Sequence, residues 1–523
     1  MKNQSVMSHN FASVPKVEIS RSSFDRSHGH KTTFDAGYLV PIFLDEALPG
    51  DTFNLNMTGF ARMATPIKPM MDNVYMETFF FAVPNRLVWE NWEKFMGNET
   101  ESTSGTKYSV PHSTLHPGQG DTEGLHDYLG IPIYSDANVV FQSLPLRAYN
   151  LIWNEWFRDQ NLQTEAIVAL GDDGDEFLNY NLLRRGKRHD YFTSCLPWPQ
   201  KGEAVTIPML DVLDVTRATT GAQVPNFSLG GVAVQLQSTN STAEIHADTS
   251  VGSIETLKWG NADIGLEVDL RNATATSIND LRIAFQLQKM LERDARGGTR
   301  YPEVIHAHFG VTSPDARLQR PEYLGGGSTR VNINPVEQKG ETATTPQGNL
   351  AAYATANLGG HGFTKSFTEH TIIIGLINVR ADLTYQEGLN RMWKRIDRYS
   401  YFWPSFQHIG EQIVYGDEIY ASSDNDLEPV FGYQEKYAEY RYKPSMITGK
   451  FCSNYSQSLD IWHLSQDFGA TPKLNDSFIE DNPPIDRVIA IPSEPHFLLD
   501  TYFKYRCARP MPLYGVPGNI DRF

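Results

Sequence analysis

The chain has few cysteines, and their spacing excludes several kinds of site. Only three occur in 523 residues, at Cys195, Cys452 and Cys507. No CxxC pair is present, so the sequence predicts neither a zinc knuckle nor a thiol redox motif. The odd number and the wide spacing argue against a disulfide framework, and they suit a reducing compartment such as the bacterial cytoplasm.

Long apolar runs are also missing. The longest, residues 372–379, is interrupted by Gly375 and Asn378, and it falls well short of the roughly 18 residues that a membrane-spanning helix needs. The opening MKNQSVMSHNFASVPK has no apolar core, so we expect no secretory signal. Hydrophobic residues nonetheless make up 40% of the chain and aromatic residues 12%, which is typical of a globular protein.

Positive charge is in short supply. The 62 acidic residues outnumber the 45 lysines and arginines, and the formal net charge is −17. A protein that coats nucleic acid over its whole surface needs the opposite balance. We therefore expect a soluble protein in which any contact with nucleic acid is confined to local patches.

Motifs of common enzyme classes are absent. The segment GGHGFTKS at 359–366 is similar to a phosphate-binding loop, but Thr364 stands where a glycine must precede Lys365. His306 and His308 would share one face of a strand, yet no nearby carboxylate or cysteine completes a metal set. No GxSxG or HExxH sequence occurs. We therefore expect a protein that is not an enzyme.

The chain does contain clear strand signals. Residues 52–58 alternate between apolar and polar side chains, which predicts a strand with one buried face. Residues 74–83 alternate at first and then become apolar on both faces, as in a strand covered on both sides. Further strands are expected at 371–380, 411–420, 487–491 and 501–508. Apolar positions at helical spacing predict helices at 146–158, 280–296 and 385–398.

Strands dominate, helices are few and loops are long, which favours an antiparallel β-sandwich with large insertions over a series of βαβ units. Two segments differ from this framework. Residues 1–34 are polar and mildly basic, and we expect them to form an extended arm that does not pack. Residues 219–278 are rich in Ser, Thr, Ala, Gly and Asn but contain short alternating pieces, which predicts an exposed β insertion rather than a linker.

Five long segments carry a family resemblance. They are the block 20–84, TSCLPWPQKG at 193–202, the run 281–327 ending in SPDARLQRPEYLGGG, FTEHTIIIGLINVRADLTYQEGLNRMWKR at 367–395 and RCARPMPLYGVPG at 506–518. In the same order, these segments resemble the major capsid protein of gokushoviruses, a branch of the Microviridae, which are small icosahedral bacteriophages with single-stranded DNA. Residues 203–278 match least, and members of that family also differ most from one another there.

The resemblance implies a mainly β chain built on an eight-stranded antiparallel jelly-roll barrel with long loop insertions and a few helices. It implies an arm at 1–34, a jelly-roll domain at 35–202 and 279–523, and a variable spike insertion at 203–278 on the three-fold axis. The implied function is structural. About 60 copies would self-assemble into a T=1 shell around circular single-stranded DNA, formed in the bacterial host cytoplasm and present in the virion.

The resemblance also implies the partners. They are copies of the chain itself, an internal scaffolding protein, a pilot protein, a small basic DNA-binding protein and circular single-stranded DNA. The spike would contact a receptor on the host cell surface, and we assign Asn226, Asn240 and Trp259 to it. With a net charge of −17 per chain, about 60 copies carry roughly −1000 charges, so the shell cannot neutralise the genome as a whole.

Four basic residues recur at i, i+3, i+4 and i+7 in the predicted helix 385–398, so a helix would bring them to one face. A basic face beside an apolar stripe with aromatic residues suits contact with phosphates and stacked bases. The alternative is a solvated or subunit-contacting face. The four residues are Arg391, Lys394, Arg395 and Arg398, the stripe is Leu389, Met392, Trp393 and Ile396, and further candidates in the arm are Lys16, Arg21 and Arg26.

Three smaller groups have competing interpretations. A basic cluster could bind DNA or pair with acidic groups of a neighbouring copy, and we favour the interface. The proline-stiffened terminal segment is expected to clasp a neighbouring subunit. An acidic run could hold a calcium ion, although it lacks the EF-hand order and a solvated loop is the alternative. The residues are Arg184, Arg185, Lys187 and Arg188 in the cluster, Arg509 and Pro510 in the terminal segment, and Asp172, Asp173, Asp175 and Glu176 in the acidic run.

A rival interpretation comes from a different class of protein. Trp and Tyr are plentiful, as they are in carbohydrate-active β-sandwich enzymes and lectins. A glycoside hydrolase needs a cleft with paired carboxylates, and the sequence marks no such pair. The size of the purified material would separate the two, because a shell has a mass of megadaltons and a glycan-binding protein does not.

Overall fold

The chain folds around two antiparallel β-sheets. The computed structural model describes residues 20–98, 108–205, 278–312, 319–421 and 430–514, together with seven short strands between residues 216 and 267. One sheet contains β1 (Ser22–Asp25), β2 (His28–Phe34), β4 (Thr52–Met63), β16 (Asn332–Glu337), β17 (Leu350–Ser366) and β21 (Phe497–Arg509). The other contains β3 (Val40–Ala47), β5 (Val74–Pro84), β15 (Glu322–Arg330) and β18 (Thr371–Ala381). The prediction of a mainly β, antiparallel chain is confirmed.

Eight of these strands pair in a nested pattern. β2 pairs with β21, β3 with β18, β4 with β17 and β5 with β15, always antiparallel. Numbered in chain order, these are the pairs 1–8, 2–7, 3–6 and 4–5, and the two sheets run 1-8-3-6 and 2-7-4-5. Such a pattern is one long hairpin wrapped on itself, which is the arrangement of an eight-stranded jelly roll.

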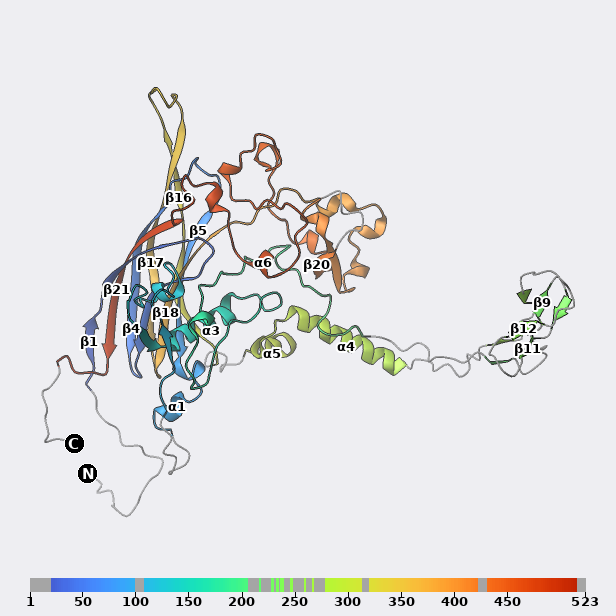
Figure 1. Ribbon diagram of the computed structural model, residues 1–523, viewed down its shortest axis with the longest axis horizontal. Helices are drawn as coiled ribbons and strands as arrows, with labels where there is room; N and C mark the ends of the chain where they lie inside the picture. The colour runs from blue at the N-terminus through green and yellow to red at the C-terminus, as the bar shows by residue number, and fades with distance from the viewer. Residues whose placement is uncertain are drawn as a thin grey trace, which may run out of the picture. The chain divides into compact units, whose positions relative to one another are not determined.

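The last strand of the chain completes the six-stranded sheet. β21 lies between β4 on one side and β1 with β2 on the other, and Figure 1 shows this red strand beside the blue strands of the N-terminal region. The prediction of an unpacked arm is therefore wrong for residues 22–34, which form two strands. Their partner comes from the other end of the sequence, so no local pattern reveals it. Residues 1–19, including Lys16, lie outside the described part of the chain.

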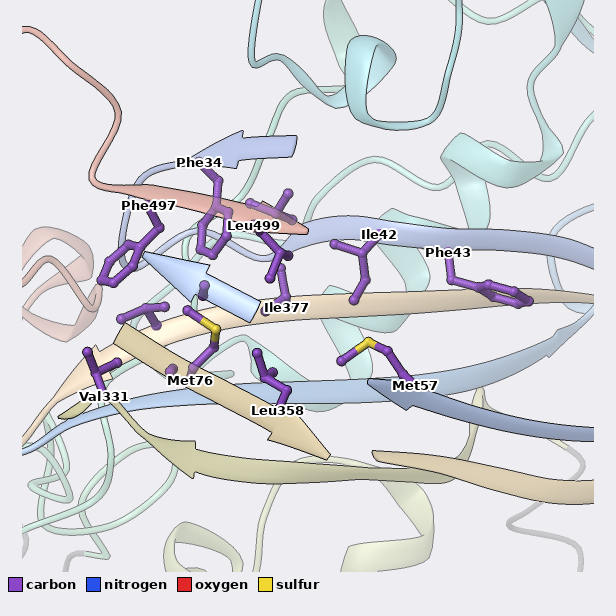
Figure 2. Packing of buried hydrophobic residues seen from close by; sticks show 14 of the residues in the cluster. Phe34, Ile42, Phe43, Met57, Met76, Val331, Leu358, Ile377, Phe497 and Leu499 are labelled. Carbon is purple, nitrogen blue, oxygen red and sulfur yellow. The ribbon is translucent and has the colours of Figure 1, made fainter. Parts of the chain in front are cut away.

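The main core lies between the two sheets. Alternate residues of each strand point inward, as Phe53, Leu55 and Met57 do on β4. In Figure 2, Phe34, Met57, Leu358, Phe497 and Leu499 from the six-stranded sheet meet Ile42, Phe43, Met76 and Ile377 from the four-stranded sheet. Burial of this apolar surface stabilises the fold by roughly 25 cal/mol per Å² removed from water.

The four-stranded sheet is covered on both faces. Every residue of β18 is buried, and the outer face of the sheet packs against helix α3 (Leu144–Ile152) and the π-helical turn Trp153–Phe157. The neighbours Phe80 and Phe81 of β5 therefore enter different cores, the main core and this outer one. The apolar run in β5 and the helix expected at 146–158 are both confirmed.

Glycines allow β15 to lie close to its neighbours. A Cβ atom on Gly326 would lie 2.0 Å from the carbonyl oxygen of Thr78, and one on Gly327 would lie 2.4 Å from the ring of His361. That ring is buried between the hydroxyls of Thr78 and Thr329, at 2.8 Å and 3.0 Å, and burial lowers its pKa. The segment 359–366, which is similar to a phosphate-binding loop, is part of strand β17.

Other predicted elements had mixed outcomes. The strands expected at 371–380 and 501–508 are confirmed as β18 and β21. The one expected at 411–420 is shorter, β19 (Glu411–Tyr415), and it pairs with β20 (Val430–Glu435). The one expected at 487–491 is wrong, because a 3-10 turn, Ile485–Arg487, precedes a single bridge at Ile489.

Two local predictions fail in instructive ways. Residues 385–398 do not form a helix, but two short 3-10 turns, η6 (Arg391–Lys394) and η7 (Arg398–Ser400). His306 and His308 lie in helix α5 (Tyr301–Phe309) rather than on a strand. Residues two positions apart on a helix point in different directions, so the two imidazoles do not share a face. Remaining elements of this part of the chain are α1 (Trp92–Phe95), α2 (Leu125–Tyr128), β6 (His112–Leu115), β7 (Val139–Gln142) and α6 (Asp476–Ile479).

Residues Gln200–Arg296 form a second compact unit. It contains the confirmed helix α4 (Ile278–Arg296), which the sequence had placed in the jelly-roll domain. Its short strands are β8 (Thr216–Arg217), β9 (Phe227–Leu229), β10 (Val232–Val234), β11 (Leu236–Ser238), β12 (Ile245–Ala247), β13 (Lys258–Trp259) and β14 (Leu266–Glu267). Of the proposed attachment residues, Trp259 is in β13, whereas Asn226 and Asn240 lie outside the described residues.

No helix in the described ranges combines the length and the apolar character needed to cross a bilayer.

Candidate functional site

The basic residues expected on an exposed helix face are turned into the protein. Arg391 donates to Glu418 Oε1 at 3.1 Å, Lys394 Nζ lies 2.5 Å from Asp417 Oδ2, and Arg395 Nη2 lies 3.4 Å from Glu439 Oε1. The fourth residue, Arg398, is exposed and its guanidinium lies 4.8 Å from the ring centre of Tyr399. The shared helix face is therefore wrong, and three of the four charges are neutralised within the subunit.

These ion pairs fasten η6 and the adjoining Arg395 to the two 3-10 turns that follow β19 and β20, Gly416–Glu418 and Ala438–Tyr440. Glu418 is buried, accepts a hydrogen bond from the Tyr191 hydroxyl at 2.9 Å, and has a raised pKa because burial outweighs the attraction of Arg391. Arg391 also donates to the carbonyl of Ile413 in β19, at 2.5 Å. A pocket of ≈ 160 Å³ opens beside this network, and Tyr191, Glu418 and Glu439 are among its lining residues.

The apolar stripe is turned outward instead. Met392, Trp393 and Ile396, which a helix would have buried, are 53%, 72% and 96% exposed. Further large apolar side chains on the same loop are exposed as well, namely Tyr399, Tyr401, Phe402, Trp403 and Ile409. We call these eight residues the 392–409 patch. The apolar residues that the predicted helix would have buried are therefore exposed, and most of the basic residues that it would have exposed point into the protein.

The basic cluster at 184–188 is mostly used inside its own subunit. Arg185 and Arg380 both bind the carboxylate of Glu77. Arg184 donates to Asn482 Oδ1 at 2.9 Å and lies over the ring of Tyr38. Arg184 and Arg185 thus have partners on their own chain, and their pairing across an interface stays a prediction.

Lys187, in the same cluster, is buried. It donates to Gln466 Oε1 at 2.8 Å, and burial lowers its pKa to about 8. Burial also raises the pKa of the neighbouring Asp481 to about 6, against the attraction of the surrounding cations. Lys187 is therefore bound inside its own subunit, and Arg188 is the member of the cluster that is exposed.

The terminal segment clasps its own subunit. Arg509 binds Asp51, with Nη2 2.8 Å from Oδ2, and Pro510 lies beside Gly50. Arg509 thus binds its own subunit, and a clasp by this segment on a neighbouring copy stays a prediction. Residues 511–514 beyond it are exposed.

The arm candidates are tied down in a similar way. Arg21 donates to Thr52 Oγ1 at 2.9 Å, and Arg26 Nη2 lies 3.0 Å from Asp45 Oδ1. The first contact ties the residue before β1 to the start of β4, and the second ties the segment between β1 and β2 to β3 of the other sheet. Both residues nonetheless remain exposed, so their contact with DNA stays a prediction.

The acidic run does not gather around a common point. Asp172 accepts hydrogen bonds from the Trp89 indole, at 2.6 Å, and from Asn91. Asp175 instead forms a buried ion pair with Arg147, at 2.7 Å and 2.9 Å, while Asp173 uses its carbonyl. Within the described ranges no group of three or more His, Cys, Asp and Glu residues is arranged to hold a metal ion. The calcium hypothesis for Asp172, Asp173 and Asp175 is therefore not supported by the geometry.

One surface was missed by sequence reasoning. The outward residues of β4 and β21 are exposed, and Lys504, Arg506 and Arg62 lie among them with Phe60 and Tyr502. A groove of ≈ 650 Å³ on this open face is lined by Phe60 and Arg62 and by Lys31, which pairs with Asp500. The alternation FLLDTYFKYR of β21 is the signal that could have identified it, since every second residue there faces outward.

Comparison with known proteins decides the family. A family model described as capsid protein (F protein) matches residues 12–519 of this chain. The chain belongs to this phage capsid protein family. It is 44% identical to capsid protein VP1 of Chlamydia phage 1 over 99% of this chain and 98% of the relative. It is 46% identical to capsid protein VP1 of Bdellovibrio phage phiMH2K, over 98% of both chains.

A more distant relative agrees. Capsid protein VP1 of Spiroplasma virus 4 is 36% identical over 98% of this chain and 97% of the relative. The resemblance to Microviridae capsid proteins is thus confirmed, and the capsid protein is a structural component of the virion.

Proposed function

We propose that this capsid protein self-assembles as about 60 copies into a closed T=1 shell around circular single-stranded DNA. The observation that carries the proposal is the nested jelly roll in a chain that belongs to a capsid protein family along almost its whole length. A jelly roll leaves only short, protected sheet edges, so a subunit can meet its neighbours through loops and faces without strand-to-strand aggregation.

The genome contact is local and lies on the open face of the six-stranded sheet. Lys504, Arg506 and Arg62 supply charge for phosphates, and Phe60 and Tyr502 supply rings on which bases can stack. The exposed Arg398 and Arg188 are further candidates. Arg391, Lys394 and Arg395 are weaker candidates, because contact with DNA would require each to leave an acidic partner inside the subunit.

The negative charge of the chain requires help from other molecules. At −17 per copy, neutralisation of the genome falls to a small basic DNA-binding protein and to cations. Assembly further involves an internal scaffolding protein and a pilot protein. The insertion at 203–278 forms the three-fold spike that contacts the host cell-surface receptor, with Asn226, Asn240 and Trp259 as candidate contacts.

The rival interpretation, a carbohydrate-active enzyme or lectin, has less support. The pocket beside η6 is lined by two acidic side chains, Glu418 and Glu439. Arg391 lies between them, 3.1 Å from Glu418 Oε1 and 4.0 Å from Glu439 Oε1. The Arg391 guanidinium thus occupies the space between the two carboxylates, where a glycosidase holds the scissile glycosidic bond.

Electron microscopy and sedimentation of the purified full-length chain test the proposed function. We expect closed icosahedral particles of megadalton mass, which contain DNA when the chain is expressed with the phage genome. A stable monomer that binds or cleaves glycans would overturn the proposal and support the rival class.

A further inference from the structure

The 392–409 patch is unusual for a soluble subunit. Eight large apolar side chains stand on one loop, and each is about half exposed or more. Aromatic side chains offer roughly 150–250 Å² each, so the patch presents on the order of 900 Å² to solvent. Monomeric proteins rarely expose contiguous apolar surface beyond a few hundred Å². The patch is instead comparable with one side of a standard protein–protein interface, about 800 Å².

The patch is continuous with a second segment. Tyr440 and Tyr442 are each half exposed, and Met446 is 66% exposed. The ring centres of Phe402 and Tyr440 are 6.4 Å apart, and the guanidinium of Arg395 lies near the rings of both Tyr401 and Tyr440, at 5.6 Å and 4.3 Å. Two stretches of the chain thus build one surface. The exposed apolar area is a property of the fold and not of one loop alone.

The loop that carries the patch is held in this conformation. Asn390 Oδ1 accepts from Met392 N at 3.0 Å, and Asp397 Oδ1 accepts from Ser400 N at 2.7 Å. The Trp403 indole donates to the carbonyl of Arg398 at 2.7 Å. Turning Trp393 or Ile396 inward would turn the neighbouring basic residues away from their partly buried carboxylates, and leaving a buried charge unpaired is strongly unfavourable. The apolar surface is therefore pre-organised.

We propose that the 392–409 patch is an interface that binds a second copy of this chain in the shell. The proposal rests on the proposed function. The patch is rich in Trp, Tyr, Phe and Met, the residues that are enriched in interface cores, and Asp397 and Arg398 are the exposed charged residues between its members. Single-stranded DNA suits the patch less, because a nucleic-acid face presents cations beside its aromatic residues, and here three of the four nearby cations point inward to carboxylates.

Hydroxyl-radical footprinting tests the occupant. Oxidation of Trp393 and Ile396 is measured in the unassembled full-length chain, in DNA-free particles and in DNA-filled particles. We expect high oxidation in the unassembled chain and an at least five-fold fall in both kinds of particle. Protection of these residues already in the unassembled chain would mean that other residues of the same chain cover the patch. Protection only in DNA-filled particles would mean that the genome covers it. Either result, or no protection in any particle, overturns the proposed interface.

Substitution at Ile396 tests the energetic role. Ile396 is 96% exposed, so Ile396→Asp should leave the melting temperature and near-ultraviolet circular dichroism of the unassembled chain unchanged. We expect an at least ten-fold lower yield of particles, because the aspartate would be buried without a partner, while Ile396→Leu assembles normally. If Ile396→Asp gives as many particles as the wild-type chain, the proposed interface is overturned but the proposed function is not. Failure of the wild-type chain to assemble overturns the proposed function, and the interface with it.

Discussion

Arg509 donates two hydrogen bonds to Asp51 Oδ2, from Nε at 2.9 Å and from Nη2 at 2.8 Å. Asp51 is fully buried and also accepts a hydrogen bond from the backbone of Leu48, at 2.9 Å. The pair joins the end of the last strand, β21, to the turn that opens β4. It therefore fastens the closing strand of the jelly roll to the framework.

Removal of Arg509 should destabilise the subunit strongly. Arg509→Met leaves Asp51 buried without a cation, and the expected loss is about 3–5 kcal/mol in the free energy of unfolding. The matched control is Arg441→Met. Its ion pair with Glu435 is half exposed on both sides, so its loss should cost less than about 1 kcal/mol. Urea denaturation of the unassembled chain measures both, and equal effects would contradict the role of the Arg509 pair.

His126 should make the subunit sensitive to acid. It is 4% exposed and stacks on Phe177, and burial lowers its pKa to about 4. The unfolded imidazole has a pKa near 6.5, so below that value the unfolded chain binds the proton more readily. Stability from His126 is therefore fully present above pH 6.5 and is lost as the pH falls to about 4, by up to about 3 kcal/mol.

His126→Phe should flatten this pH dependence. A phenyl ring keeps the stack on Phe177, and Nε2 of His126 has no hydrogen-bond partner among the described residues. The control is His116→Phe at an exposed site. Melting temperatures between pH 4 and 7 are the measurement, and an unchanged slope in the His126 variant would rule out this residue as the source.

The glycines of β15 should tolerate no side chain. A Cβ on Gly326 would meet a backbone oxygen of β5 at 2.0 Å, and a paired strand cannot move aside cheaply. Gly326→Ala should cost roughly 3 kcal/mol or prevent folding. Gly340→Ala, where nothing lies within 4 Å of the new atom, should be neutral. Comparable soluble yield and stability for the two variants would show that the sheet relaxes around Gly326.

The open sheet face should contribute to genome packaging. Lys504→Glu combined with Arg506→Glu replaces two outward cations by anions, and we expect at least about a two-fold lower DNA content per particle. Lys504→Arg with Arg506→Lys keeps the charge and is the control. The ratio of absorbance at 260 and 280 nm, measured on purified particles, reports the DNA content. Normal DNA content in the charge-reversed particles would move the genome contact to another surface.

The fold was predictable where the signal is local. In β4 and β5 the alternation of side chains already specifies which face is buried, and both strands lie where the pattern places them. β2 was missed because its partner β21 is more than 450 residues away, and a polar strand at a sheet edge has no local signature. The jelly-roll topology followed from family resemblance and not from periodicity.

The candidate site shows the limit of sequence reasoning most clearly. The spacing of Arg391, Lys394 and Arg395 is helical, and local reasoning places cations outside and apolar residues inside. Their partners, Glu418, Asp417 and Glu439, lie 23–44 residues further along the chain. These distant carboxylates reverse the orientation of the loop. No property of residues 385–398 alone predicts that reversal.

The position of β21 has a consequence for synthesis. The strand that fills the gap between β2 and β4 leaves the ribosome after every other strand of the two sheets. Until it emerges, the nascent polypeptide has an incomplete barrel, and the contacts between the two ends of the chain cannot form. Such non-local pairing must wait for the whole sequence. Chains whose translation stops before β21 thus lack the strand that closes the sheet.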